Sequence, residues 1–319
     1  MLIFTLDQAI AEFFNHCLYE KNLSVKTIRF YRIDLQQFCH YIETNRFPFE
    51  IQLIDKTHLK GYLKILAPWK PKTIKRKIAT LKALFNYLEY EDHILVNPMR
   101  KIKIKIKEPL MLPKALTLEE SSTMLKQAYA SITFTDKNKY KYLEAIRNAV
   151  VIELLFATGA RVSEIADLKL SALNLQAGTV TIFGKGGKQR IIQICNQDTL
   201  STLGVYCELF KEKIKAADNF LLINRLDKKL SDQSIRFLTR NLAVSVNSSK
   251  KVTPHVFRHT FATLLLENDV DIKYIQSLLG HSSIMTTQIY TQVNLEKQKQ
   301  ILSEKHPRMG YSMALEQCE

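Results

Sequence analysis

The sequence predicts a mainly α-helical protein with a small antiparallel β-sheet, and three observations support this fold class. Several long segments repeat apolar residues at steps of three and four, which is the pattern of amphipathic helices. Helix-start signals precede them, namely Ser24, Pro71 and the capping-box pattern Thr117-Leu118-Glu119-Glu120. One stretch, 179–194, instead has two short β-rich runs around a Gly-rich turn and predicts a hairpin.

Residues 1–100 predict an N-terminal helical bundle. The apolar stripe after Ser24 contains Ile28, Tyr31, Leu35, Phe38 and Ile42, and the stripe after Pro71 contains Ile74, Ile78, Leu81, Phe85 and Leu88. Basic residues lie off both stripes: Lys26, Arg29 and Arg32 on the first helix, and Lys72, Lys75, Arg76 and Lys82 on the second. A solvated face explains such bases on either helix alone, but two basic helices in one domain favour contact with DNA phosphates. Trp69, in the preceding loop, is predicted to pack rather than to stack on bases.

A Lys-rich segment follows the bundle. Lysine alternates with isoleucine over 101–107, which is a strand signature, but Pro98, Pro109 and Pro113 bracket it. We therefore predict an extended interdomain linker over 101–116. Lys101, Lys103 and Lys105 would contact the phosphate backbone of DNA from this linker.

Residues 117–319 predict a second, mostly helical domain. A long apolar helix covers about 143–157 and ends at Gly159, a natural C-terminal cap. The runs Thr179–Phe183 and Gln189–Ile194 form the predicted hairpin, with Lys185 in the turn between them. The later segments are again helical in pattern.

The net charge limits the possible partners, and the cysteine content limits the possible disulfides and metal sites. The chain has 319 residues, a formal net charge of +15 and a pI of about 9.5, so we expect two domains and a polyanionic partner. Nucleic acid is favoured over an anionic membrane. Five cysteines without a C-x-x-C pair argue against a disulfide framework or a zinc site. With no long apolar run, the sequence predicts a cytoplasmic protein with no membrane contact, no metal and no cofactor.

Six side chains in the second domain have the chemistry needed to break and rejoin a DNA strand. They are Arg161, Lys185, His255, Arg258, His281 and Tyr290. Breaking a phosphodiester requires neutralised non-bridging oxygens, a nucleophile and a proton for the leaving oxygen. Two guanidiniums, two imidazoles, an amine and a phenol supply these functions, and guanidinium binds phosphate through paired hydrogen bonds.

Each of the six also has an ordinary interpretation when taken alone. Arg161 is a surface arginine by default, although its place at a helix junction predicts a buried guanidinium oriented by Glu164. Lys185 and His281 suit solvated loop positions, and a single His-x-x-Arg is common by chance. Tyr290 is inert at its ordinary pKa of about 10 unless cations surround it.

Considered together, these motifs resemble the tyrosine recombinase family, and most closely its bacterial Xer branch. The resemblance rests on TGARVSE at 158–164, GKG at 184–186, HVFRHTFAT at 255–263, LLGHSS at 278–283, TQIYT at 287–291 and HPR at 306–308. It implies a SAM-like core-binding domain followed by a catalytic domain, closing as a C-shaped clamp around DNA. Residues about 131–142 and the tail beyond Met309 are extra length relative to that branch.

The resemblance also implies roles and partners. Tyr290 would form a 3′-phosphotyrosyl bond, with Arg161, Arg258 and His281 stabilising charge. Lys185 would protonate the 5′-oxygen, and His255 would handle the tyrosine proton. The expected partners are double-stranded DNA with a specific site, a homotetramer or a heterotetramer with a second recombinase, and a DNA translocase or accessory proteins. In that family the C-terminal helix docks on a neighbouring protomer, and segment 294–303 matches that helix.

Two other functions remain open from the sequence. A type IB topoisomerase-like relaxase would use the same residues on one duplex. A non-catalytic DNA-binding regulator would need only the basic surface. Within the family, resolution of chromosome or plasmid dimers and integration or excision of a mobile element are both compatible with the sequence.

Overall fold

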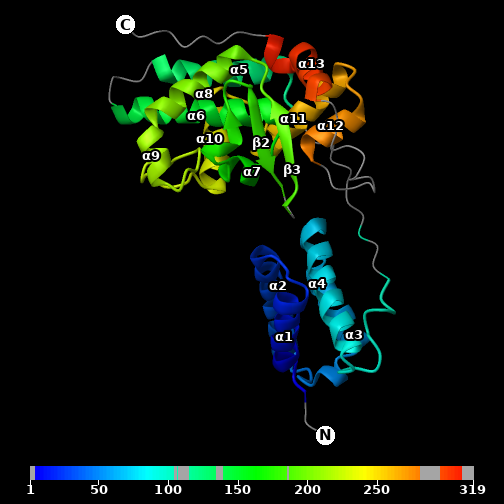
Figure 1. Cartoon of the computed structure of the whole chain (residues 1–319). Coiled ribbons are helices and arrows are strands. Elements are labelled where there is room, and N and C mark those ends of the chain that lie inside the picture. The colour runs from blue at the N-terminus through cyan, green and yellow to red at the C-terminus, as the bar shows by residue number, and fades with distance from the viewer. Residues whose placement is uncertain are drawn as a thin grey trace. The chain divides into compact units, whose positions relative to one another are not determined.

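The computed structural model describes residues 4–103, 106, 115–133, 139–184, 187–280 and 295–310. The chain divides into two compact units, Met1–Met111 and Leu112–Glu319 (Figure 1). Each has its own hydrophobic core. In the described part of the chain, no helix has the length and apolarity needed to span a membrane.

Over the residues that the structure describes, the first unit is a bundle of four α-helices. They are α1 (Leu6–Asn15), α2 (Val25–Thr44), α3 (Lys56–Leu66) and α4 (Pro71–Tyr90), with a π-helical turn at His16–Glu20 and a 3-10 turn at Ile51–Leu53. The predicted stripes are confirmed, since the stripe residues of α2 and α4 lie in the core of the unit or pack against it, and the two helices contact each other. Ser24 caps α2 by accepting the Thr27 amide at 3.2 Å, and Pro71 occupies the first turn of α4. Trp69 is half exposed, and its ring covers the Lys77 ammonium.

A buried carboxylate joins α2 to α4, which the stripes did not predict. Asp34 accepts hydrogen bonds from Arg76 at 2.6 Å, Lys77 at 3.1 Å and Thr80 at 3.0 Å. Both Asp34 and Lys77 are buried, so each charge depends on the other for compensation. This cluster fixes the two basic helices of the unit relative to each other.

The start of the Lys-rich segment packs on the first unit. Met99 and Ile102 belong to its core, and Ile106 packs against that core. The Asn97 side chain accepts the Met99 amide at 2.8 Å and so stabilises the turn before this segment. The alternation of lysine and isoleucine therefore reflects one-sided packing, with Lys101 and Lys103 exposed. Lys105 lies outside the described residues.

The second unit contains a small sheet surrounded by helices. Its helices are α5 (Leu118–Thr133), α6 (Lys139–Thr158), α7 (Val162–Ala166), α8 (Gln197–Leu209), α9 (Lys211–Ala216), α10 (Asp232–Ser245), α11 (Pro254–Glu267), α12 (Ile272–Leu279) and α13 (Leu295–Lys305). Thr117 and Glu120 form the predicted capping box, at 2.7 and 3.1 Å. Residues 131–133 and 139–142 of the predicted extra segment are helical, and 134–138 lie outside the described residues.

The sheet has three antiparallel strands in the order β1 (Leu173–Asn174), β2 (Thr179–Phe183) and β3 (Gln189–Gln193). The predicted hairpin is confirmed, with Ile182 paired to Arg190. The two-residue β1 strand was not predicted.

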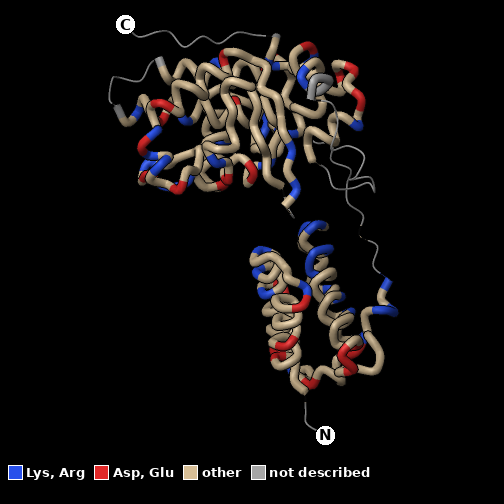
Figure 2. The backbone as a smooth tube through the Cα atoms, in the orientation of Figure 1, with Lys and Arg blue, Asp and Glu red and all other residues tan. Residues whose placement is uncertain are grey.

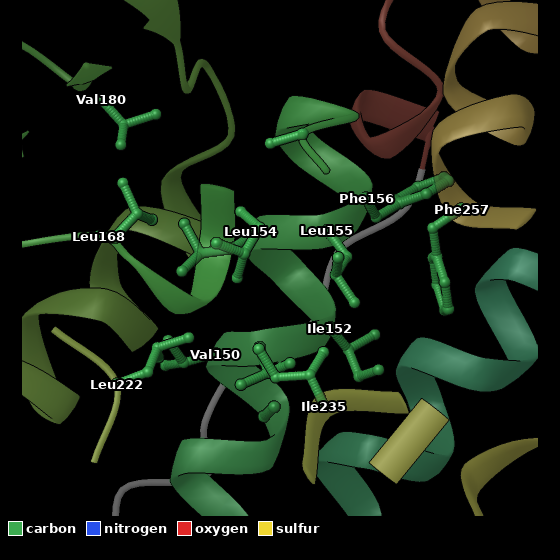
Figure 3. Close-up of a cluster of buried hydrophobic side chains, with 14 of the residues drawn as sticks. Val150, Ile152, Leu154, Leu155, Phe156, Leu168, Val180, Leu222, Ile235 and Phe257 are labelled. Carbon is green, nitrogen blue, oxygen red and sulfur yellow. The ribbon is translucent and has the colours of Figure 1, made fainter. Parts of the chain in front are cut away.

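Helix α6 forms the centre of the second core (Figure 3). Val150, Leu154, Leu155 and Phe156 are fully buried, and the helix packs against α5, α8 and α11. A helix that is apolar on all sides must be buried on all sides, which explains this position. Gly159 then ends α6 in a left-handed conformation with φ of +57°, as predicted.

The C-terminal segment of the described chain packs on its own unit. Leu302 of α13 is buried in the core, and Arg308, in the following 3-10 turn, donates to the buried Glu153 of α6 at 2.8 Å. Tyr129 and Thr199 also donate to Glu153, at 2.8 and 2.9 Å. Segment 294–303, predicted to dock on a neighbouring protomer, thus belongs largely to a helix anchored here within one chain.

Breaking this anchor is expected to be costly. Arg308→Met leaves the Glu153 charge buried without its partner, so we expect the free energy of unfolding to fall by about 3–5 kcal/mol. Adding Glu153→Gln removes that charge, keeps an acceptor oxygen for Tyr129, and should recover much of the loss. Urea denaturation measures both effects, with Arg225→Met at an exposed position as the control. A loss below about 1 kcal/mol for Arg308→Met would contradict a buried charge pair.

Candidate active site

Three of the six predicted active residues lie among the described residues, and all three belong to the second unit. They are Arg161, His255 and Arg258. Lys185, His281 and Tyr290 lie outside the described residues. The elements that lead directly into Lys185 and His281 are described, namely the hairpin as far as Gly184 and α12 as far as Gly280.

Arg161 stands at the junction between α6 and α7, where Glu164 orients it. The Arg161 backbone amide donates to Glu164 Oε2 at 2.8 Å, and its Nη1 donates to Oε1 at 2.8 Å. The Glu164 side chain is 5% exposed, whereas that of Arg161 is 40% exposed. The predicted orientation is therefore confirmed, but the predicted burial is wrong. Its guanidinium is half-open to solvent because the glutamate occupies the buried position.

Arg258 is the buried arginine of the site. It lies on α11, which begins at Pro254 as predicted. Its Nη1 donates to the Gly159 carbonyl at 2.9 Å and its Nη2 to the Leu279 carbonyl at 2.7 Å. Arg258 thus links the end of α6 to the end of α12. His255, one turn earlier on α11, is exposed.

Arg190 on β3 is a third arginine of this cluster, and sequence reasoning missed it. Its Nη2 donates to Glu164 Oε2 at 2.7 Å, and its Nε donates to the Leu278 carbonyl at 2.7 Å. The only local signal was an arginine two residues after Lys188, the last residue of the Gly-Lys turn. Its partners are 26 and 88 residues away in sequence, so their proximity depends on the fold.

The hairpin containing Lys185 starts beside the same glutamate. The Gly184 amide donates to the Lys188 carbonyl at 2.7 Å, which closes the turn. A Cβ placed on Gly184 would lie 3.7 Å from Glu164 Oε1. The residue before Lys185 is therefore next to the Arg161–Glu164 pair.

The charges of these groups act on one another. Burial, and then the positive charges of Arg161 and Arg190, lower the pKa of Arg258 to about 10, so it remains protonated at neutral pH. Burial alone would raise the pKa of Glu164, but hydrogen bonds from Arg190 and Arg161 lower it below its usual value. Three cations and one anion leave an excess of positive charge, which suits a bound phosphodiester.

The basic residues predicted to contact DNA lie mainly at one end of the first unit. Lys and Arg gather where α2 and α4 begin, whereas Asp and Glu lie mostly toward the opposite end (Figure 2). Those exposed on the two helices are Lys26, Arg29, Arg32, Lys72, Lys75 and Lys82. Arg76 differs, because its guanidinium is bound by Asp34 and covers the Phe30 ring at 4.9 Å. Helix N-termini add partial positive charge at the same end.

Comparison with known proteins identifies two family matches. Residues 123–297 match the phage integrase family, which is more than half of the chain, and residues 10–92 match the phage integrase N-terminal SAM-like domain. A tyrosine recombinase from Agathobacter rectalis is 44% identical over 96% of this chain and 98% of its own length. Tyrosine recombinase XerD from Listeria innocua is 32% identical over 95% of this chain and 100% of its own. Tyrosine recombinase XerC from Thermodesulfovibrio yellowstonii is also 32% identical, over 93% of this chain and 96% of its own length.

Solved structures share the fold at lower identity. XerH recombinase bound to its difH substrate in a pre-cleavage complex has a TM-score of 0.64 and 22% identity, covering 92% of this chain and 83% of its own. A lambda integrase tetramer bound to a Holliday junction has a TM-score of 0.62 and 18% identity, and the match covers 88% of this chain and 76% of the integrase chain.

The role of Arg258 as a link between two helix ends can be tested by unfolding. A lysine at this position presents a single nitrogen and lacks the fixed spacing of Nη1 and Nη2 that brings one donor to each of the Gly159 and Leu279 carbonyls. We expect Arg258→Lys to lower the free energy of unfolding by about 1–3 kcal/mol, because a buried carbonyl loses its donor. Arg240→Lys, at an exposed position of α10, is the matched control. Equal melting temperatures for the two variants would argue against the link.

Proposed function

Because the chain belongs to the phage integrase family and is a tyrosine recombinase, an enzyme of site-specific DNA recombination, we propose that Tyr290 is its nucleophile and that Arg161 and Arg258 bind the scissile phosphate. The observation that carries this proposal is that Arg258 of α11 donates to the carbonyl of Gly159, two residues before Arg161, whose guanidinium Glu164 orients. The two arginines are far apart in sequence, yet their charges act on each other. Such a preorganised cationic site stabilises a phosphorane-like transition state.

The proposed reaction is a transesterification. The Tyr290 phenolic oxygen attacks phosphorus, a 3′-phosphotyrosyl bond forms and the bond to the 5′-oxygen breaks. His255 takes the phenolic proton, and Lys185 gives a proton to the departing oxygen. A 5′-hydroxyl from the partner strand then reverses the step, so bond energy is retained and ATP is not required.

The arginines are suited to separate tasks at the phosphate. Arg161 is half exposed, so its guanidinium is accessible to a DNA phosphate while Glu164 holds its orientation. Arg258 is anchored through Nη1 and Nη2, each of which carries a second N–H. His281, which follows the α12 cap residue Gly280, completes the proposed set that stabilises charge.

In this proposal, the first unit supplies most of the contacts to DNA. Residues 1–100 act as the core-binding domain, and Lys26, Arg29, Arg32, Lys72 and Lys75 contact phosphates. Arg76, held by Asp34, has a fixed orientation, and Lys101, Lys103 and Lys105 extend the contact along the linker of 101–116. Residues 117–319 form the catalytic domain.

The proposed assembly is a tetramer on two DNA sites that exchanges strands through a Holliday junction. It is supported by the shared fold with the lambda integrase tetramer on such a junction. The relatives include both XerC and XerD, so the tetramer contains this chain alone or with a second recombinase. Docking of segment 294–303 on a neighbouring protomer in this assembly requires α13 to release Leu302 from the core of its own unit.

The nucleophile can be tested with a nicked suicide substrate, in which the released strand diffuses away and the covalent complex accumulates. We expect the natural protein to form this complex and Tyr290→Phe to form none, while both bind the same DNA with equal affinity. Denaturing gel electrophoresis measures the complex. Tyr274→Phe, on α12, is the control and should retain cleavage. Covalent complex with Tyr290→Phe would refute the nucleophile assignment.

The phosphate contacts predict a change in salt dependence. Lys72→Gln removes one proposed phosphate contact, so the slope of log Kd against log salt should become shallower by about 1, equally for specific and unrelated DNA. Fluorescence anisotropy at several salt concentrations measures this slope. Lys56→Gln, at the start of α3, removes the same charge and should leave the slope unchanged. Equal slopes for the two variants would exclude Lys72 from the DNA interface.

A further inference from the structure

We propose that Arg190 is a positioning residue that holds Glu164 and the end of α12 in place, so that Arg161 stays free to bind the scissile phosphate. This inference rests on the proposed function of Arg161. It adds a residue outside the six predicted active residues. Arg190 acts through other groups, since its Nε, Nη1 and Nη2 each donate to a protein acceptor.

Arg190 uses two edges of its guanidinium at once. On one edge, Nη2 and Nη1 donate to the two Glu164 carboxylate oxygens, at 2.7 and 3.3 Å. On the other edge, Nε donates to the Leu278 carbonyl at 2.7 Å. Its side chain is 13% exposed, so water competes weakly for these bonds. The planar group therefore bridges a catalytic-site carboxylate and a helix terminus.

Gly280 provides independent evidence for this bridge. It ends α12 in a left-handed conformation with φ of +64°. A Cβ at this position would lie 3.1 Å from Arg190 Nη1 and 3.4 Å from its Cδ and Cζ. The absence of a side chain thus lets the guanidinium pack against the residue directly before His281.

Because Arg190 lies on β3, it also connects the β2–β3 hairpin to Glu164 and to the end of α12. It pairs with Ile182 of β2, within the hairpin whose turn includes Lys185. One side chain therefore contacts Glu164, which orients Arg161, and the end of α12, which leads to His281. It does so from the hairpin itself. The distance between these segments is fixed by a rigid, bidentate group that lysine cannot replace.

Loss of Arg190 has a specific consequence for Arg161. Glu164 Oε2 would keep only the Arg161 backbone amide as a donor in the set described above. A buried carboxylate with too few donors attracts the nearest cation more strongly. The Arg161 guanidinium is already 2.8 Å from Oε1, so Glu164 would compete with the DNA phosphate for it.

The test measures single-turnover cleavage at saturating DNA with two suicide substrates. One has the normal phosphodiester, and the other has a methylphosphonate at the scissile position, which removes one negative charge. The variants are Arg190→Gln, Arg190→Lys and, as a matched control, Arg225→Gln at an exposed turn. Melting temperature and DNA affinity are measured for each protein.

We expect Arg190→Gln to cleave the phosphodiester on the order of 100-fold more slowly, because small misplacement of a catalytic group has such an effect. DNA affinity should match that of the natural protein. On the methylphosphonate the defect should shrink to less than about tenfold, since a neutral phosphorus centre depends less on Arg161. Arg190→Lys should show the same pattern, because a single nitrogen lacks the planar fork with which Arg190 reaches Glu164 and Leu278 together. Arg225→Gln should cleave normally.

Several results would overturn this inference. An equal defect on both substrates indicates general structural damage, and a loss of DNA affinity indicates direct DNA contact. Normal cleavage by Arg190→Lys shows that charge alone suffices. Arg190→Gln is not used if its melting temperature falls far below that of the natural protein. In that case Arg190→Lys, which keeps the charge and the aliphatic stem, is compared on the phosphodiester and methylphosphonate substrates instead. Failure of the proposed function is distinguishable, because then the natural protein itself forms no covalent complex.

Discussion

The carboxylate of Glu164 is the constraint on which the site depends. It is buried, and it accepts hydrogen bonds from guanidiniums that come from two different elements, Arg161 and Arg190. With Arg258 nearby, the cluster would otherwise hold only cations at close range, and their repulsion would disperse them. One anion lets three arginines remain together in a fixed arrangement while a net positive charge is left for a phosphodiester.

The segment that contains Tyr290 lies between two anchored parts of the chain. On one side, Arg190 and Arg258 donate to the last carbonyls of α12, so the residue before His281 has a fixed position. On the other side, Leu302 and the buried Arg308–Glu153 pair fix α13 and the turn after it. Unsatisfied carbonyls at a helix end are a ready acceptor for arginine, which explains why the cationic cluster forms at this end of α12.

Local patterns in the sequence predicted most of the fold and part of the site. The stripes of α2 and α4, the caps at Ser24 and Thr117, the hairpin and the glycine end of α6 all depend on residues close in sequence. So does the Arg161–Glu164 contact, three residues apart. Arg190, the Asp34–Lys77 pair and the Arg308–Glu153 pair were missed, because their partners are 26 to 155 residues away and no local period encodes them. Arg161 was expected to be buried because it lies at a helix junction, but the Glu164 side chain takes the buried position.

A structure of the protein bound to its uncleaved DNA site tests the central claim most directly. Nitrogen atoms of Arg161 and Arg258 should each lie within about 3 Å of non-bridging oxygens of one phosphate, with both Arg190 contacts to Glu164 preserved. The account would be contradicted if Arg161 and Arg258 contacted different phosphates. It would also be contradicted if Arg190 left Glu164 and bound the phosphate itself.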